Sequence, residues 1–137
     1  MTAKIFLDTN ILVYAFDREA VAKREFARSL IRSDVDWVVS WQVVQEFCNV
    51  ALHRFKQPIR AEDLEDTLDL ILMPRCLVMP TKEIYLQAIR IQAQTTYRYY
   101  DSLIVASVLV AGAKQLYSED MQASRRIGDL EIVNPFV

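Results

Sequence analysis

Short apolar runs alternate with longer amphipathic segments along most of this chain. The short runs have the length of buried strands, and in the longer segments apolar residues recur at the three- and four-residue spacing of a helix face. This pattern predicts five strands, over residues 4–7, 36–40, 76–79, 115–117 and 130–134. It also predicts helices that begin near residues 11, 18, 41, 64, 81 and 101, and a short helical piece after residue 120.

Strands that alternate with helices along a sequence usually form a parallel sheet with helices on both faces. We therefore expect an α/β fold, a three-layer α/β/α sandwich around a central, mainly parallel sheet of about five strands. The chain has 137 residues, a length that suits one hydrophobic core. The expected organisation is a single domain over residues 1–137.

Two polar residues and a glycine mark where several helices should begin and end. Asn10 and Ser40 have short polar side chains that can accept hydrogen bonds from free backbone N–H groups. They are expected to cap the helices that follow them. Gly112 is expected at the end of the helix that begins at Asp101, because glycine readily adopts the left-handed conformation found there.

Composition and charge exclude several classes of protein. The chain has one histidine and two widely spaced cysteines, Cys48 and Cys76, so a zinc site or disulfide framework is disfavoured and both cysteines are expected to be reduced core residues. A net charge of −2 disfavours a protein that coats nucleic acid. No secretory signal or membrane-spanning stretch is evident, which predicts a cytoplasmic protein without membrane association.

Two aspartates lie where predicted strands end. Asp8 directly follows the first strand, and Asp120 follows the fourth after two intervening residues. Ligand sites in open α/β sheets lie outside the carboxyl ends of the strands, so both positions suit a site. Each aspartate could instead be an ordinary turn residue or helix cap, which is a common role at such a place.

Two further acids lie on predicted helices. Asp101 is the only ionisable residue from position 101 to 113, at the start of a helix that is apolar nearly all round and is therefore expected to be buried. Its carboxylate could belong to a site or could simply cap the helix. Glu46 lies at the boundary between the apolar and polar faces of its helix, where it could equally be a solvated surface residue.

The four acids together indicate a metal site. Carboxylates that crowd together repel one another unless they are protonated or bind a cation. An oxygen-only set of ligands suits Mg²⁺ or Mn²⁺. Such an ion can activate a water molecule and stabilise charge on a phosphate, which is sufficient to hydrolyse a phosphodiester without a nucleophilic side chain.

At these residues the chain resembles the PIN-domain nucleases and, more narrowly, the VapC-type ribonuclease toxins of bacterial toxin–antitoxin pairs. The matching pieces appear in the family's order and span nearly the whole chain: FLDTNILVYAFD, QVVQEFCNV, YYDSLIVASVLVAGA and LYSEDMQ. The resemblance implies a PIN-like fold and a divalent-metal-dependent endoribonuclease that uses Mg²⁺ or Mn²⁺. It also implies products with 5′-phosphate and 3′-hydroxyl ends.

The resemblance assigns roles to the acids by motif position. Asp8 and Asp101 match the acids expected to hold the metal most directly, and Glu46 matches the helix acid. Asp120 matches the acid of the family's Thr/Ser-x-Asp segment. All four would therefore be catalytic residues and metal ligands.

Three supporting residues follow from the same motifs. Asn10 matches the polar residue that supports the first acid, and Ser118 occupies the hydroxyl position before Asp120. Glu119 is an additional acid beside Asp120, and either of the two could face the site. The family further implies an RNA substrate, a homodimer and an inhibitory antitoxin protein.

Two other classes of function are compatible with an acid after the first strand. An aspartyl-phosphate phosphatase uses such an aspartate as its nucleophile, but it usually has a second aspartate two residues later, where this chain has Asn10. A non-catalytic metal- or RNA-binding regulator, including a phosphoacceptor receiver domain, is the other alternative. A receiver would need paired acids after the first strand and a lysine after a late strand, and neither is in place.

Two groups of side chains could contact RNA or could have structural roles. A basic group on the predicted helix after residue 18 could guide RNA or form a solvated face; it comprises Lys23, Arg24, Arg28 and Arg32. Tyrosines just before Asp101 could stack on unpaired bases, anchor their loop or make a dimer contact; they are Tyr97, Tyr99 and Tyr100.

Overall fold

A six-stranded sheet forms the centre of the protein. The computed structural model describes residues 3–121 and 126–137. The strands run in the order β3-β2-β1-β4-β6-β5, and every neighbouring pair is parallel except the antiparallel pair β5–β6. Their bounds are β1 Ile5–Leu7, β2 Trp37–Ser40, β3 Cys76–Val78, β4 Gln115–Tyr117, β5 Arg126–Ile127 and β6 Leu130–Val133.

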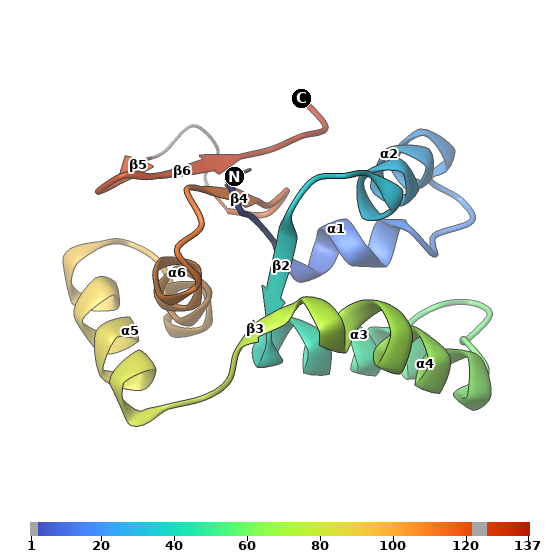
Figure 1. Ribbon diagram of the computed structural model, residues 1–137, viewed down its shortest axis with the longest axis horizontal. Coiled ribbons are helices and arrows are strands. Elements are labelled where there is room, and N and C mark those ends of the chain that lie inside the picture. Colours follow the sequence, from blue (N-terminus) through green and yellow to red (C-terminus); the bar gives the residue numbers. More distant parts are fainter. Residues whose placement is uncertain (1–2, 122–125) are drawn as a thin grey trace.

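Helices cover both sides of this sheet. Figure 1 shows α5 and α6 on one side of β2, and α1, α2, α3 and α4 on the other. Helix α5 packs along α6, and α1 packs against both α2 and α3. The helices are α1 Thr9–Tyr14, α2 Val21–Arg32, α3 Trp41–His53, α4 Ala61–Thr67, α5 Lys82–Gln94 and α6 Tyr99–Ala111. The predicted three-layer α/β fold with a mainly parallel sheet is confirmed.

The apolar pattern determines which helices are buried. Seven consecutive residues of α6, from Ser102 to Val108, are buried, as expected for a helix that is apolar nearly all round. Helix α5 is amphipathic and buries Ile84, Ala88 and Ile91. No described helix is long and apolar enough to cross a membrane.

Helix ends agree with the prediction in two places. Gly112 ends α6 in the left-handed conformation, with φ 73°. Thr81 is the N-cap of α5, and its hydroxyl accepts a hydrogen bond from the Ile84 backbone amide at 3.2 Å. Ser40 occupies the N-cap position of α3, but its side chain makes no capping hydrogen bond.

Four predicted helix starts were wrong. Helix α2 begins at Val21 and α4 at Ala61, three residues after and three residues before the predicted positions. The other two starts concern predicted site residues. Asn10 does not cap α1, because the helix begins at Thr9 and the Asp8 side chain accepts a hydrogen bond from the Thr9 amide instead. Helix α6 begins at Tyr99, so Asp101 lies within its first turn rather than at its start. At α1 and α6 the helix begins two residues earlier than the polar pattern indicated.

Two further features of the fold differ from the prediction. Strand β5 was not predicted because two residues are too few to show a pattern; it turns into β6 through Gly128, whose φ is 58°. Helix α4 continues as a π-helical turn over Leu68–Leu72 and a 3₁₀ turn over Met73–Arg75, where a single helix was expected. The helical piece predicted after residue 120 lies largely over residues 122–125, outside the described residues.

Candidate active site

The ends of the parallel strands β1 and β4 bring distant acids to one edge of the sheet. Asp8 follows β1, and its backbone amide donates to the Tyr117 carbonyl of β4 at 3.0 Å. The next residue of that segment, Ser118, donates through its amide to the Val133 carbonyl of β6 at 3.0 Å. The turn that carries Asp120 is therefore attached to the same edge as Asp8.

Asp8 is the most buried of these acids, with 9% of its surface exposed. One carboxylate oxygen accepts from the Thr9 amide at 2.7 Å, and the other accepts from the Ser118 hydroxyl at 2.8 Å. The pKa of Asp8 is nevertheless raised from 3.8 to about 6, chiefly by burial. The two hydrogen bonds lower this pKa in part, while the charges of Glu46 and Asp101 raise it further.

Glu46 is half-buried on α3 and is held by two neutral donors. The Thr9 hydroxyl donates to one of its carboxylate oxygens at 2.8 Å, and the Gln42 amide donates to the other at 3.3 Å. The Gln42 amide also donates to the Tyr100 carbonyl at 3.1 Å. Gln42 thus connects the start of α3, the Glu46 carboxylate and the start of α6.

Asp101 and Asp120 form the more accessible side of the site. Burial is the largest cause of a raised pKa at Asp101; Arg98 opposes it, and the negative charges of Asp120 and Glu46 add to it. Asp120 is exposed, and its carboxylate accepts a hydrogen bond from the side-chain amide of Asn10 at 3.1 Å. We call Asp8, Glu46, Asp101 and Asp120 the four site acids, because the structure brings them near enough to influence one another's charge.

Glu119 points away from the four site acids, although it precedes Asp120 directly. Its two carboxylate oxygens accept hydrogen bonds from the Tyr14 hydroxyl and the Lys23 ammonium group, each at 2.5 Å. Burial raises the pKa of Glu119, but the hydrogen bonds from Lys23 and Tyr14 outweigh this and lower it overall. Asp120, by contrast, interacts electrostatically with Asp101.

The sequence reasoning did not identify Thr9 and Gln42. Thr9 binds two of the four site acids, through its amide to Asp8 and through its hydroxyl to Glu46. Gln42 is only 3% exposed and lies one helical turn before Glu46. An amide four residues before a helix acid was the available signal, because such residues are neighbours on the helix surface.

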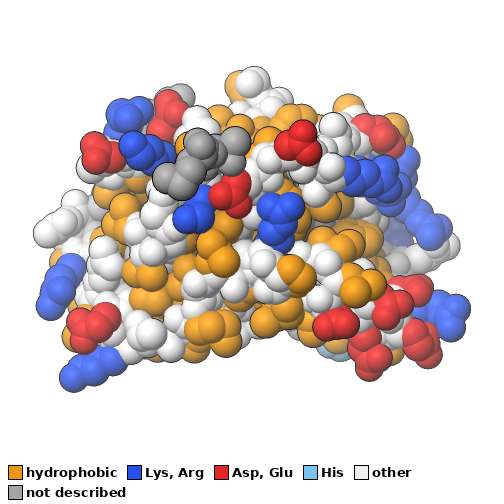
Figure 2. All heavy atoms as spheres, viewed as in Figure 1, with side chains coloured by type: hydrophobic (Ala, Val, Ile, Leu, Met, Phe, Trp, Pro, Cys, Tyr) orange, Lys and Arg blue, Asp and Glu red, His pale blue; other side chains and the backbone are white. Residues whose placement is uncertain are grey.

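Two residues of the basic group on α2 make contacts within the protein. Lys23 pairs with Glu119, whereas the Arg28 side chain donates to the Ala15 carbonyl at 2.7 Å. Figure 2 shows Lys and Arg gathered at upper right, Asp and Glu at lower right, and a broad apolar band between the two ends of this face. Among the tyrosines, Tyr97 is buried, whereas Tyr100 beside Asp101 is 71% exposed.

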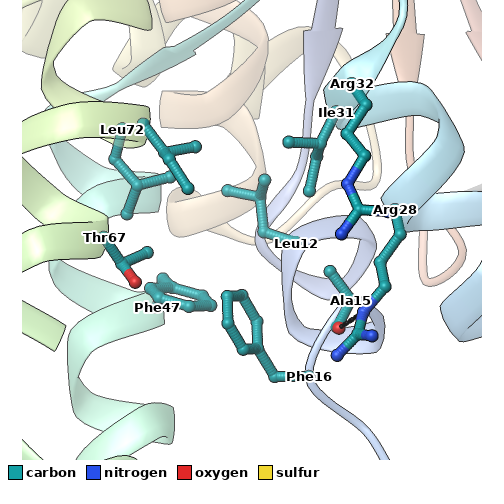
Figure 3. Close-up of a pocket in the computed structure, with 10 residues that line it drawn as sticks. Leu12, Ala15, Phe16, Arg28, Ile31, Arg32, Phe47, Thr67 and Leu72 are labelled. Carbon is teal, nitrogen blue, oxygen red and sulfur yellow. Dashed lines mark hydrogen bonds between the residues drawn. The ribbon is translucent and has the colours of Figure 1, made fainter. Parts of the chain in front are cut away.

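An apolar pocket of about 260 Å³ lies apart from the four site acids. Its wall combines residues of α1, α2, α3 and the π-helical turn, including Leu12, Phe16, Phe47 and Leu72. Figure 3 shows these apolar side chains facing one another, with Arg28 and Arg32 along one side. The pocket is therefore an apolar hollow bordered by positive charge.

The donor chemistry of the site suits a divalent cation. All four site acids offer carboxylate oxygens, the ligands that Mg²⁺ and Mn²⁺ prefer. Within the described part of the chain, no three acid, histidine or cysteine side chains are arranged closely enough to form a complete metal-binding group. Asp8 and Asp101 are nevertheless disfavoured as free anions, since burial and neighbouring charges raise both pKa values. A cation beside them would remove that penalty.

Several solved structures are similar in fold to this chain. The Rickettsia felis VapBC2 complex bound to a promoter DNA fragment has a TM-score of 0.62 at 18% identity, over 94% of this chain and 96% of that one. VapC20 of Mycobacterium tuberculosis, a sarcin-ricin loop cleaving toxin, has a TM-score of 0.64 at 18% identity, over 85% and 89%. A Klebsiella pneumoniae toxin–antitoxin complex has a TM-score of 0.67 at 17% identity, over 96% and 97%.

The sequence itself also matches a known family. No curated relative matches this chain. The PIN domain, however, matches residues 5–128, a segment that contains all four site acids and nearly every described element. This match confirms the resemblance drawn from the sequence motifs. The chain belongs to the PIN domain family.

Proposed function

We propose that this protein is a divalent-metal-dependent endoribonuclease and the toxin of a toxin–antitoxin pair. The observation that carries the proposal is the gathering of the four site acids at the edge of the sheet where β1 and β4 end, in a chain that belongs to the PIN domain family. Similarity in fold to VapC20, described as a sarcin-ricin loop cleaving toxin, supports RNA as the substrate class. We also propose that residues 1–137 act as one nuclease domain.

In this mechanism the chain's own residues hold negative charge in fixed positions. Asp8 and Asp101 would bind Mg²⁺ or Mn²⁺ most directly, with Glu46 and Asp120 acting directly or through water. Thr9 and Ser118 fix the orientation of Asp8, and Gln42 fixes that of Glu46. When bound, the ion would lower the pKa of a coordinated water and offset charge on the scissile phosphate.

The geometry gives less support to the alternative of an aspartyl-phosphate phosphatase. A nucleophilic Asp8 would need a carboxylate oxygen free to attack phosphorus. Here both oxygens already accept hydrogen bonds, and the side chain is almost completely buried. Orientation of a metal ligand explains this arrangement better than nucleophilic attack.

The apolar pocket supports an antitoxin partner. An apolar side chain of the antitoxin could enter between Phe16 and Leu72, while a carboxylate beside it could pair with Arg28 or Arg32 (Figure 3). The VapBC2 and Klebsiella pneumoniae structures are toxin–antitoxin complexes of similar fold, which supports a partner of this kind. We also propose that the chain forms a homodimer, as the motif resemblance implies.

The test of the nuclease is RNA cleavage by the purified, partner-free chain. Total RNA would be incubated with Mg²⁺, Mn²⁺ or EDTA and with the wild type, Asp8→Asn, Asp101→Asn or Lys56→Met. Lys56 pairs with Glu19 on an exposed surface and serves as the matched control. We expect metal-dependent cleavage with 5′-phosphate products that both aspartate variants lose and Lys56→Met retains.

Two results would contradict the mechanism. Cleavage that survives EDTA or either aspartate substitution would show that the activity does not depend on these acids and metal. Bound Mn²⁺ with no cleavage of any RNA would favour the non-catalytic regulator instead.

A further inference from the structure

Glu119 belongs to a clamp that joins three separate segments. Its carboxylate accepts from Tyr14 at the end of α1 and from Lys23 on α2, while its backbone lies in the turn after β4. The Lys23 ammonium group also lies within hydrogen-bonding distance of the Tyr14 hydroxyl, at 3.3 Å. These groups form a closed triangle of contacts, which we call the Glu119 clamp: Glu119, Lys23 and Tyr14.

Aromatic rings near the C-terminal end of the described chain support the clamp. Phe136 packs edge-on against Tyr14, with ring centroids 5.2 Å apart, and against Phe26 at 5.4 Å. The Lys23 ammonium group lies 4.8 Å from the Tyr14 ring centroid and 5.3 Å from that of Phe136. Cation–π contacts of this kind add to the ion pair with Glu119 and restrict where Lys23 can go.

The same turn is tied to Asp120 through Asn10. The Glu119 amide donates to the Asn10 side-chain oxygen at 3.3 Å, and the Asn10 side-chain nitrogen donates to Asp120 at 3.1 Å. The Asn10 side chain therefore binds both the Glu119 backbone and the Asp120 carboxylate. A shift of Glu119 would move both bonds together.

We propose that Lys23 and Glu119 are positioning residues, which hold the turn over residues 118–120 so that Asp120 faces Asp101 while Glu119 is kept away. This inference rests on the proposed metal-dependent function. The bonds from Tyr14 and Lys23 hold the Glu119 side chain toward α1 and α2, whereas the bond from the Asn10 side chain holds the neighbouring Asp120 carboxylate. The clamp also neutralises an acid that would otherwise add to the repulsion among the four site acids.

The experiment measures Mn²⁺ binding by isothermal titration calorimetry rather than activity alone. Four chains are compared: the wild type, Lys23→Met, Asp120→Asn and the variant with both substitutions. Methionine keeps most of the length of lysine and removes its charge. Lys56→Met is the control, because it breaks another Lys–Glu pair, at 2.7 Å, on an exposed surface.

Positioning and simple charge effects predict opposite results. Loss of a positive charge near a cation site should by itself tighten Mn²⁺ binding. If the clamp positions Asp120, Lys23→Met should instead weaken Mn²⁺ binding about tenfold, as loss of an outer support of a metal ligand commonly does. The same substitution should change binding by less than about twofold when Asp120→Asn is already present, because the clamp then has no ligand to position.

A charge-swapped variant provides a second test if Lys23→Met fails to fold. Combining Lys23→Glu with Glu119→Lys keeps an ion pair in the same place, so Mn²⁺ affinity within about threefold of the wild type would support the clamp. Unchanged or tighter Mn²⁺ binding in Lys23→Met, or an equal loss in the Asp120→Asn background, would overturn it. A wild-type chain that neither binds Mn²⁺ nor cleaves RNA would instead refute the proposed function itself.

Discussion

Replacing Asp8 with asparagine should stabilise the fold at neutral pH while removing the proposed activity. The pKa of Asp8 rises from 3.8 to about 6 on folding, so the folded chain binds this proton more tightly than the unfolded chain. The wild type therefore loses stability as the pH rises from about 4 to about 6, and the full cost is present above pH 6. About two pKa units correspond to about 3 kcal/mol of unfolding free energy.

The asparagine variant does not lose this unfolding free energy, because its side chain cannot ionise. It does alter one bond, since its amide would have to donate to the Ser118 hydroxyl that now donates to Asp8. Allowing about 1 kcal/mol for that exchange, Asp8→Asn should be more stable than the wild type by about 1–2 kcal/mol at pH 7.5. At pH 4 the order should reverse, because both side chains are then neutral in the folded state.

Urea unfolding in EDTA at pH 4 and pH 7.5 would measure this difference. Asp34→Asn, which makes the same substitution at an exposed position, is the matched control. If the stability of Asp8→Asn relative to the wild type did not rise between pH 4 and pH 7.5, the folded Asp8 would not be a destabilised anion. Burial would then not disfavour the ionised form of Asp8.

Three further predictions follow from the site and the pocket. Mn²⁺ at a tenfold excess over its Kd should stabilise the wild type by about 1.4 kcal/mol and Asp8→Asn much less, as thermal unfolding with and without metal would show. Thr9→Val removes the hydroxyl bound to Glu46 and should lower the RNA cleavage rate about tenfold, whereas Thr9→Ser should retain it. Ile71→Asp places a charge in the pocket wall; it should abolish inhibition by a co-expressed antitoxin without changing cleavage by the free chain, and inhibition that persists would exclude this pocket.

The sequence predicts most of the fold because its strands and helices have strong apolar patterns. Asp8 and Asp120 were identified from their positions after strands, and Asp101 from its isolation in an apolar helix. The first residue of each helix was harder to predict, because neighbouring polar residues such as Asp8 and Asn10 can each serve as an N-cap. Which of the two residues caps α1 depends on where β1 ends. The apolar pattern locates that end only to within a residue or two.

The orientation of Glu119 and Asp120 could not be predicted from local sequence. Both residues are acidic and adjacent, and either could face the site. The structure decides between them through contacts with Lys23 and Tyr14, which lie 96 and 105 residues away in the sequence. Such long-range contacts leave no periodic signal, so only the folded arrangement reveals them.

The way these acids are held fits a site that reserves its negative charge for a cation from solution. Within the described part of the chain, none of the four site acids forms an ion pair with lysine or arginine. Neutral donors bind three of these acids, Asp8, Glu46 and Asp120. The donors are Thr9, Ser118, Gln42 and Asn10. Hydroxyl and amide groups orient a carboxylate without cancelling its charge, whereas a lysine would do both. Glu119, the neighbouring acid that faces away, is the one that receives a lysine. A lysine thus pairs with the acid for which the proposed mechanism has no use, whereas the four acids that would bind a divalent ion are left without such an ion pair.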